Sequence, residues 1–176
     1  MVEIVSDRGY AEANVRDVID HAGVSRKTFY DLYASKEDCL LGIYDETAQC
    51  LRAIVQHAHE RGVTPQERID AALDIVVEWI GTEPELARLC VLETPTSGHA
   101  GRKRITATLT WLIGVMTDVL GDLDVPELLP ELVVGGIHAM LSHRLVNDVR
   151  DFEGLSAELS EVWVALERWG MPRLAA

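Results

Sequence analysis

The chain has 176 residues, of which 48% are hydrophobic and 26% charged, and its formal net charge is −13 at pH 7. This length and composition exclude a disordered protein, and no apolar run reaches the roughly 18 residues of a membrane span. The acidic balance also excludes nonspecific nucleic-acid binding by the surface as a whole, because duplex DNA repels a negative surface.

The first predicted element is a short helix over residues 1–8, ended by Gly9. Val2, Ile4 and Val5 are its apolar residues, and no polar residue caps its start. A helix of about two turns is marginal in isolation, so we expect it to pack on the helices that follow.

Residues 14–40 have the pattern of two short helices joined by a sharp turn and followed by a third. Asn14 is the expected N-cap of a helix over residues 15–22, and Asp17 completes an acidic version of the capping box. Gly23 then provides the positive φ that the end of this helix requires.

A second helix is expected over residues 26–33, with Ser25 as its N-cap. Ser35 and Asp38 cap the start of the third. This arrangement is a helix-turn-helix, whose second helix enters the major groove of DNA.

The rest of the chain repeats apolar residues at helical spacing and has no strand pattern. The expected helices cover residues 36–61, 65–81, 84–92, 101–120, 126–149 and 155–169. The helix over residues 36–61, at roughly 39 Å, is long enough to leave one subdomain and enter another. We therefore predict an all-α fold with about nine helices.

The last two helices are rich in small and apolar side chains. Gly135 and Gly136 each cost up to about 1 kcal/mol relative to alanine in a helix interior, and close approach of another helix is the usual compensation. We interpret this hairpin as half of a symmetric four-helix dimer interface, with an ordinary intramolecular hairpin as the alternative. The expected interface residues are Leu132, Gly135, Gly136, Ala139, Met140, Leu159, Trp163 and Leu166.

The sequence VSRKTFYDLYASKED over residues 24–38 resembles the signature of the tetracycline-repressor (TetR) family at its second and third helices. The segments 8–10 and 15–19 resemble the same family. The resemblance implies a helix-turn-helix domain over residues 1–45 and a ligand-binding and dimerisation domain over 46–176. Because the first helix of the family begins further upstream, we expect it to be truncated in this chain.

The resemblance also implies a set of DNA contacts. These are Arg16, Arg26, Lys27, Thr28, Tyr30 and Lys36. Arg26 and Lys27 lie where the family reads base edges, and Arg16 lies where it reaches a base or a phosphate. Guanidinium suits guanine O6 and N7. Thr28, Tyr30 and Lys36 match positions at which the family contacts phosphate, and such contacts carry no sequence information. Asp31 and Leu32 depart from the polar or basic residues that the family more often has there.

The resemblance predicts a ligand-responsive transcriptional regulator, a repressor that binds a palindromic operator as a homodimer and is released by a small-molecule effector. Residues 1–45 carry five basic and nine acidic side chains, a net charge of −4, so DNA contact requires a local basic face. The alternative is a small-molecule-binding or interaction protein of the same fold with weak or lost DNA binding.

In the family the second domain binds the effector between its middle helices. The candidate pocket residues interrupt apolar faces and are Trp79, Cys90, Glu93, His99, Trp111 and His138. Core packing is the alternative for the two tryptophans, surface exposure for Glu93 and His99, and a core or interface position for His138. The basic run at residues 102–104 suits an acidic ligand or is a solvated cluster. The sequence does not identify the effector.

Catalytic and metal-binding motifs are missing from the sequence. The histidine spacings match neither HExxH nor a zinc pattern, and neither GxSxG nor a Walker loop occurs. The three cysteines form no CxxC pair, so we expect reduced thiols in a cytoplasmic protein. The sequence therefore predicts a protein that is not an enzyme and holds no metal or cofactor.

Overall fold

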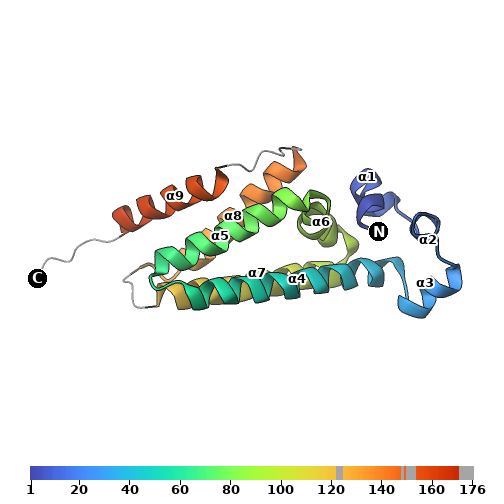
Figure 1. Ribbon diagram of the computed structural model, residues 1–176, viewed down its shortest axis with the longest axis horizontal. Helices are drawn as coiled ribbons and strands as arrows, with labels where there is room; N and C mark the ends of the chain where they lie inside the picture. The colour runs from blue at the N-terminus through green and yellow to red at the C-terminus, as the bar shows by residue number, and fades with distance from the viewer. Residues whose placement is uncertain (122–124, 148, 150–153, 171–176) are drawn as a thin grey trace, which may run out of the picture. The chain divides into compact units, whose positions relative to one another are not determined.

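The computed structural model of the chain describes residues 1–121, 125–147, 149 and 154–170. Within these residues it is all-α, as predicted, and contains no strand. The helices are α1 (Val2–Glu12), α2 (Val15–Ala22), α3 (Arg26–Leu32), α4 (Lys36–Arg61), α5 (Pro65–Thr82), α6 (Pro84–Arg88), α7 (His99–Leu120), α8 (Leu129–Val146) and α9 (Leu155–Gly170) (Figure 1). A π-helical turn, η1 (Leu89–Glu93), and a 3₁₀ turn, η2 (Thr94–Ser97), connect α6 to α7. No helix in the described ranges is long and apolar enough to cross a membrane.

Two helices, α1 and α8, differ from their predicted boundaries. Gly9 leaves the helical conformation with φ 77° and ψ 159°, but α1 resumes for one more turn to Glu12. α8 begins at Leu129 rather than at Pro126, because Pro130 occupies its first turn, where a missing N–H costs nothing.

The predicted caps of the helix-turn-helix are confirmed. The Asp17 N–H donates to Asn14 Oδ1 and the Asn14 N–H donates to Asp17 Oδ2, both at 3.1 Å. Gly23 has φ 64°, and Ser25 Oγ accepts the Thr28 N–H at 3.0 Å. Local sequence alone thus specifies where α2 ends and α3 begins.

The described residues divide into two compact units. The first unit comprises residues 1–50 and 83–108, and the second comprises 51–82 and the described residues from 109 onward. α4 and α7 contribute to both units. The predicted helix-turn-helix domain lies wholly within the first unit, while a domain boundary after residue 45 stays a prediction.

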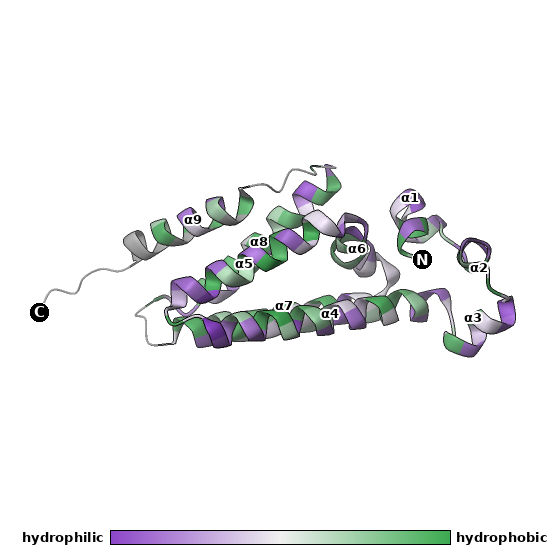
Figure 2. Cartoon of the chain, in the orientation of Figure 1, coloured by the Kyte–Doolittle hydropathy of each residue, from purple (hydrophilic) through white to green (hydrophobic). Residues whose placement is uncertain are grey.

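Each unit has its own hydrophobic core. The core of the first unit joins α1–α4 to η1 through Ile4, Val5, Ala13, Val18, Phe29, Cys39, Leu40, Tyr44, Leu89 and Cys90. In the second unit, buried side chains of α5 and α7 pack with apolar residues of α8 and α9; the buried members are Ile69, Leu73, Val119 and Leu120. Hydrophobic and hydrophilic stretches alternate along α4, as expected of an amphipathic helix (Figure 2).

Of the two glycines in α7, Gly101 has no room for a side chain. A Cβ at this position would overlap the carbonyl oxygen of Thr94 and lie against Ser97 Oγ. Because backbone has to move, we expect Gly101→Ala to lower the free energy of unfolding by roughly 1–3 kcal/mol in urea denaturation.

Gly114→Ala is the matched control in the same helix, since nothing lies within 4 Å of its Cβ position. It is expected to stabilise the chain by up to about 1 kcal/mol. Equal effects of the two substitutions would show that Gly101 is not tightly packed.

Candidate DNA-binding site

The orientation of α3 follows from its one buried residue, Phe29, which is 3% exposed and faces the core of the first unit. At 100° per residue, the positions two before and two after it point the opposite way. These are Lys27 and Asp31, and both are exposed. By the same rule Arg26 and Tyr30 lie between this side and Phe29, and both are exposed. α3 thus presents a polar face to solvent.

Two pairings organise this face. Lys27 Nζ lies 2.8 Å from Asp31 Oδ2, an ion pair one helical turn apart. The guanidinium of Arg26 lies 5.5 Å from the centre of the Tyr30 ring, which holds the arginine along the helix surface. Lys27 is therefore neutralised by its neighbour, whereas Arg26 has no acidic partner within the described part of the chain.

The two other outward candidates near the turn are exposed and locally bonded. Arg16 Nε lies 3.5 Å from Asp20 Oδ2 on the surface of α2. The Thr28 hydroxyl lies 2.8 Å from that of Ser25, so the two hydroxyls stand together at the start of α3. Their DNA contacts stay predictions.

Lys36, expected to grip phosphate, is already bonded within the chain. Its ammonium donates to the carbonyl oxygens of Tyr10 and Ala13, each at 2.7 Å. It also lies 4.1 Å from the centre of the Tyr10 ring. A phosphate contact by Lys36 likewise stays a prediction. In the structure its ammonium binds backbone carbonyl groups at the end of α1.

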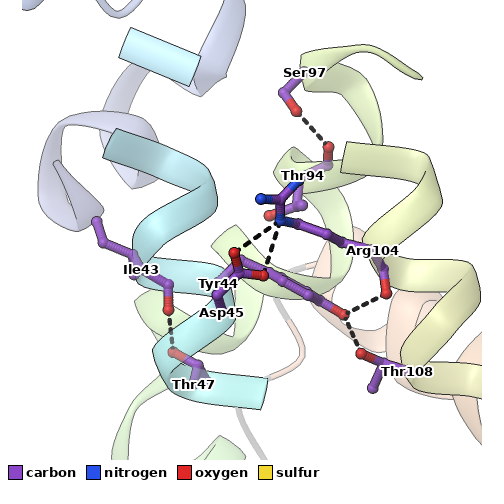
Figure 3. A network of polar contacts seen from close by, with 8 residues as sticks. All are labelled: Ile43, Tyr44, Asp45, Thr47, Thr94, Ser97, Arg104 and Thr108. Carbon is purple, nitrogen blue, oxygen red and sulfur yellow. Dashed lines mark hydrogen bonds and ion pairs between the residues drawn. The ribbon is translucent and has the colours of Figure 1, made fainter. Parts of the chain in front are cut away.

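A polar network that the sequence did not reveal fixes the first half of α4 against the start of α7 (Figure 3). Arg104 Nε donates to both carboxylate oxygens of Asp45 at 2.8 and 2.9 Å. The buried Tyr44 hydroxyl donates to Thr108 Oγ1 at 2.9 Å. Such partners are about 60 residues apart in sequence, and no local spacing signals them. The bonds hold α4, which follows α3 directly, in a defined position.

The structure divides the predicted effector residues between the two units. Cys90, Glu93 and His99 lie in the first unit, and Trp79, Trp111 and His138 lie in the second. Cys90 is buried in the core, and burial raises the pKa of its thiol to about 12. Glu93 accepts a backbone hydrogen bond and His99 is exposed at the start of α7. Cys90 and Glu93 therefore have structural positions and His99 a surface position. Ligand contacts by these three residues stay predictions.

The three candidates of the second unit are half-buried. The Arg52 guanidinium covers the Trp111 ring at 5.0 Å from its centre. His138 Nε2 is buried and has no hydrogen-bond partner among the residues that the structure describes, and desolvation lowers the pKa of this imidazole. A buried ring nitrogen without a partner is a position where a ligand group is able to bond.

The predicted dimer residues of α8 are mostly on its outer side. Leu132 is 69% exposed, Ala139 is exposed, and nothing lies within 4 Å of a Cβ built on Gly135 or Gly136. The predicted compensation for the glycines, close approach of another helix, is therefore not provided by the described part of this chain. Met140 and Leu159 are half-buried, and Leu159 packs on the second core.

The two remaining interface candidates, Trp163 and Leu166, have side chains outside the described residues. Histidine, cysteine, aspartate and glutamate side chains form no group of three or more able to hold a metal ion in the ranges that the structure describes.

Comparison with known proteins agrees with this arrangement. Residues 2–43 match the model of the bacterial regulatory proteins of the tetR family. This N-terminal part of the chain is therefore similar to the tetR family of bacterial regulatory proteins. The match covers α1–α3 and the start of α4 and so includes the helix-turn-helix. Proteins of this family are regulators rather than enzymes.

Solved structures share the fold over more than nine-tenths of this chain. The fatty acid degradation regulator FadR from Bacillus halodurans has a TM-score of 0.82 and 18% identity, and the match covers 92% of this chain and 89% of that one. A TetR-like transcriptional regulator from Rhodococcus sp. RHA1 has a TM-score of 0.79 and 19% identity, covering 94% and 91%. FadR from Bacillus subtilis, solved in complex with stearoyl-CoA, has a TM-score of 0.76 and 23% identity, covering 92% of each chain.

Proposed function

We propose that this chain is a ligand-responsive transcriptional repressor that acts in the cytoplasm, binds a palindromic operator as a homodimer and is released by a small-molecule effector. The observation that carries the proposal is the capped helix-turn-helix, with Phe29 buried and with Arg26, Lys27 and Tyr30 exposed on α3. This orientation suits a recognition helix in the major groove.

The test is a gel-shift and footprinting experiment with the DNA upstream of the chain's own gene. We expect a protected site with two-fold symmetry, because a symmetric dimer reads two equivalent half-sites. Binding should weaken steeply with salt as phosphate contacts are replaced by counterions. A uniform smear without a protected site would contradict operator recognition.

We expect the effector to have a substantial apolar part. The core of the second unit is built from aliphatic side chains of α5, α7, α8 and α9, and the half-buried Trp79, Trp111 and His138 belong to the same unit. FadR from Bacillus subtilis, of similar fold, binds stearoyl-CoA. We therefore include acyl-CoA among the candidate effectors.

Tryptophan fluorescence tests this class directly, because all four tryptophans follow residue 78 and none lies in the first unit. Stearoyl-CoA is expected to change the emission and to release bound DNA, whereas CoA without an acyl chain is not. Identical responses to the two compounds would exclude recognition of the acyl chain.

A second function, ligand or partner binding without DNA recognition, is favoured by one observation. Lys27 is paired with Asp31 and Arg16 with Asp20, so two of the predicted DNA-contacting cations are already neutralised. The footprint described above separates the two functions.

Asp31→Asn tests how much this neutralisation limits DNA binding. The substitution leaves Lys27 free and removes a negative charge that faces away from the core. We expect operator affinity to rise about threefold or more and the slope of log affinity against log salt to steepen by up to ~0.9. Stability should change by less than about 0.5 kcal/mol, because exposed pairs one turn apart contribute little.

Fluorescence anisotropy at several salt concentrations measures both quantities. Asp20→Asn is the parallel test on α2, where it frees Arg16, the other paired cation predicted to contact DNA. A loss of affinity in Asp31→Asn would mean that the carboxylate itself contacts DNA.

A further inference from the structure

The last turn of α1, residues 10–13, is held at both ends by charged side chains from elsewhere in the first unit. The kink at Gly9 interrupts the helix, so the N–H of Tyr10 opens a new turn. Glu93, the last residue of η1, accepts this N–H through Oε2 at 2.8 Å. A carboxylate at the N-terminal end of a turn offsets the partial positive charge of its free N–H groups.

Lys36 holds the opposite end of the same turn. In a continuing helix the Tyr10 carbonyl would accept the N–H of Asn14, but that N–H donates to Asp17 Oδ2 instead. The Lys36 ammonium therefore bonds the carbonyl oxygens of Tyr10 and Ala13, both at 2.7 Å. A cation at the C-terminal end of a turn is the favourable counterpart of an anion at its start.

This doubly held turn joins three parts of the first unit. Glu93 comes from η1, Lys36 is the first residue of α4, and α1 also pairs with α2. The pairs with α2 are Arg8 with Asp17 at 3.5 Å and Glu3 with His21 at 3.0 Å. A shift of the turn would therefore move α2 relative to α4, and with it the helix-turn-helix.

We propose that Lys36 and Glu93 are positioning residues for DNA binding, which act by fixing the 10–13 turn and do not touch DNA. The proposal rests on the DNA-binding function proposed above. It departs from the phosphate contact that the family resemblance implies for Lys36. The Lys36 ammonium already has two carbonyl acceptors and the Tyr10 ring as partners. Moving the ammonium to a phosphate would break both of its hydrogen bonds to the carbonyl oxygens.

Salt dependence distinguishes positioning from phosphate contact. Lys36→Met and Arg26→Met remove one positive charge each, and operator affinity is measured for both across a range of salt concentrations. We expect Lys36→Met to lower affinity roughly tenfold at every salt concentration with an unchanged slope. Lys36→Arg, which keeps a charged donor, should restore affinity to within about threefold. A slope reduced by about 0.9 in Lys36→Met, as one lost phosphate contact requires, would overturn the proposal.

The test of Glu93 does not rely on removing a positive charge near DNA. Gln keeps a side-chain acceptor for the Tyr10 N–H, so Glu93→Gln should retain affinity, whereas Glu93→Leu should lose roughly tenfold. Combining Glu93→Leu with Lys36→Met should cost much less than the product of the single losses, because both act on one turn. Full additivity, or equal effects of Gln and Leu, would count against a shared turn.

Amide hydrogen exchange separates this inference from the proposed function. Protection of the Tyr10 N–H should be lost in Glu93→Leu and kept in Glu93→Gln, whether or not DNA is present. If the wild-type chain binds no operator, the proposed function fails while the exchange data still decide whether Glu93 holds the turn. Unchanged protection in Glu93→Leu would overturn the inference by itself.

Discussion

Arg26→Met is expected to reduce operator affinity by about 5- to 150-fold, the loss of roughly 1–3 kcal/mol that accompanies removal of a bidentate arginine–guanine contact. Arg26 is the exposed first residue of α3 and stacks over Tyr30, so the guanidinium is held in place before DNA arrives. Its planar pair of donors matches guanine O6 and N7. Competition binding with operator variants should show relaxed preference at one base pair in each half-site.

The matched control is Arg102→Met, which removes the same charge from an exposed position at the start of α7. It should change affinity by less than about twofold, since long-range charge effects are screened beyond roughly 10 Å at 0.1 M salt. If both variants lose affinity equally and without a change in base preference, Arg26 contributes only general electrostatic attraction.

Local sequence signals were enough to predict the helix-turn-helix. Asn14, Gly23 and Ser25 act on the backbone within a few residues of themselves, through side-chain caps and a positive φ. Neither effect depends on the rest of the fold. For the same reason, the family resemblance and the observed bounds of α2 and α3 agree closely.

The supports of the site could not be predicted in this way. Glu93 is separated from Tyr10 by 83 residues and Arg104 from Asp45 by 59. Such pairs depend on tertiary packing, and an isolated Glu or Lys in a sequence is typical of a solvated surface. Lys36 shows the consequence, since its place in the motif suggested phosphate while its hydrogen bonds go to α1.

We propose that α8 forms the dimer interface, and we expect light scattering to give a dimer for the unaltered chain and a monomer of 19.5 kDa for Leu132→Arg. Leu132 is 69% exposed on the same side of α8 as the open Gly135 and Gly136 positions, a surface with little to bind within the described chain. In a symmetric interface the substitution places two arginines in an apolar contact, where unpaired charge is costly. Loss of the dimer should also lower operator affinity, because the two half-sites are then no longer bound by one linked pair of chains.

Val63→Arg is the matched control, at a position 83% exposed in the loop before α5, and should remain dimeric. Gly136→Ala adds a test of opposite sign. Within one chain the added methyl meets open space, so helix stability should rise by up to about 1 kcal/mol. Against a closely packed partner helix the same methyl should weaken the dimer. A variant that gains stability as both monomer and dimer would mean that no helix approaches this side of α8, and that the dimer forms elsewhere.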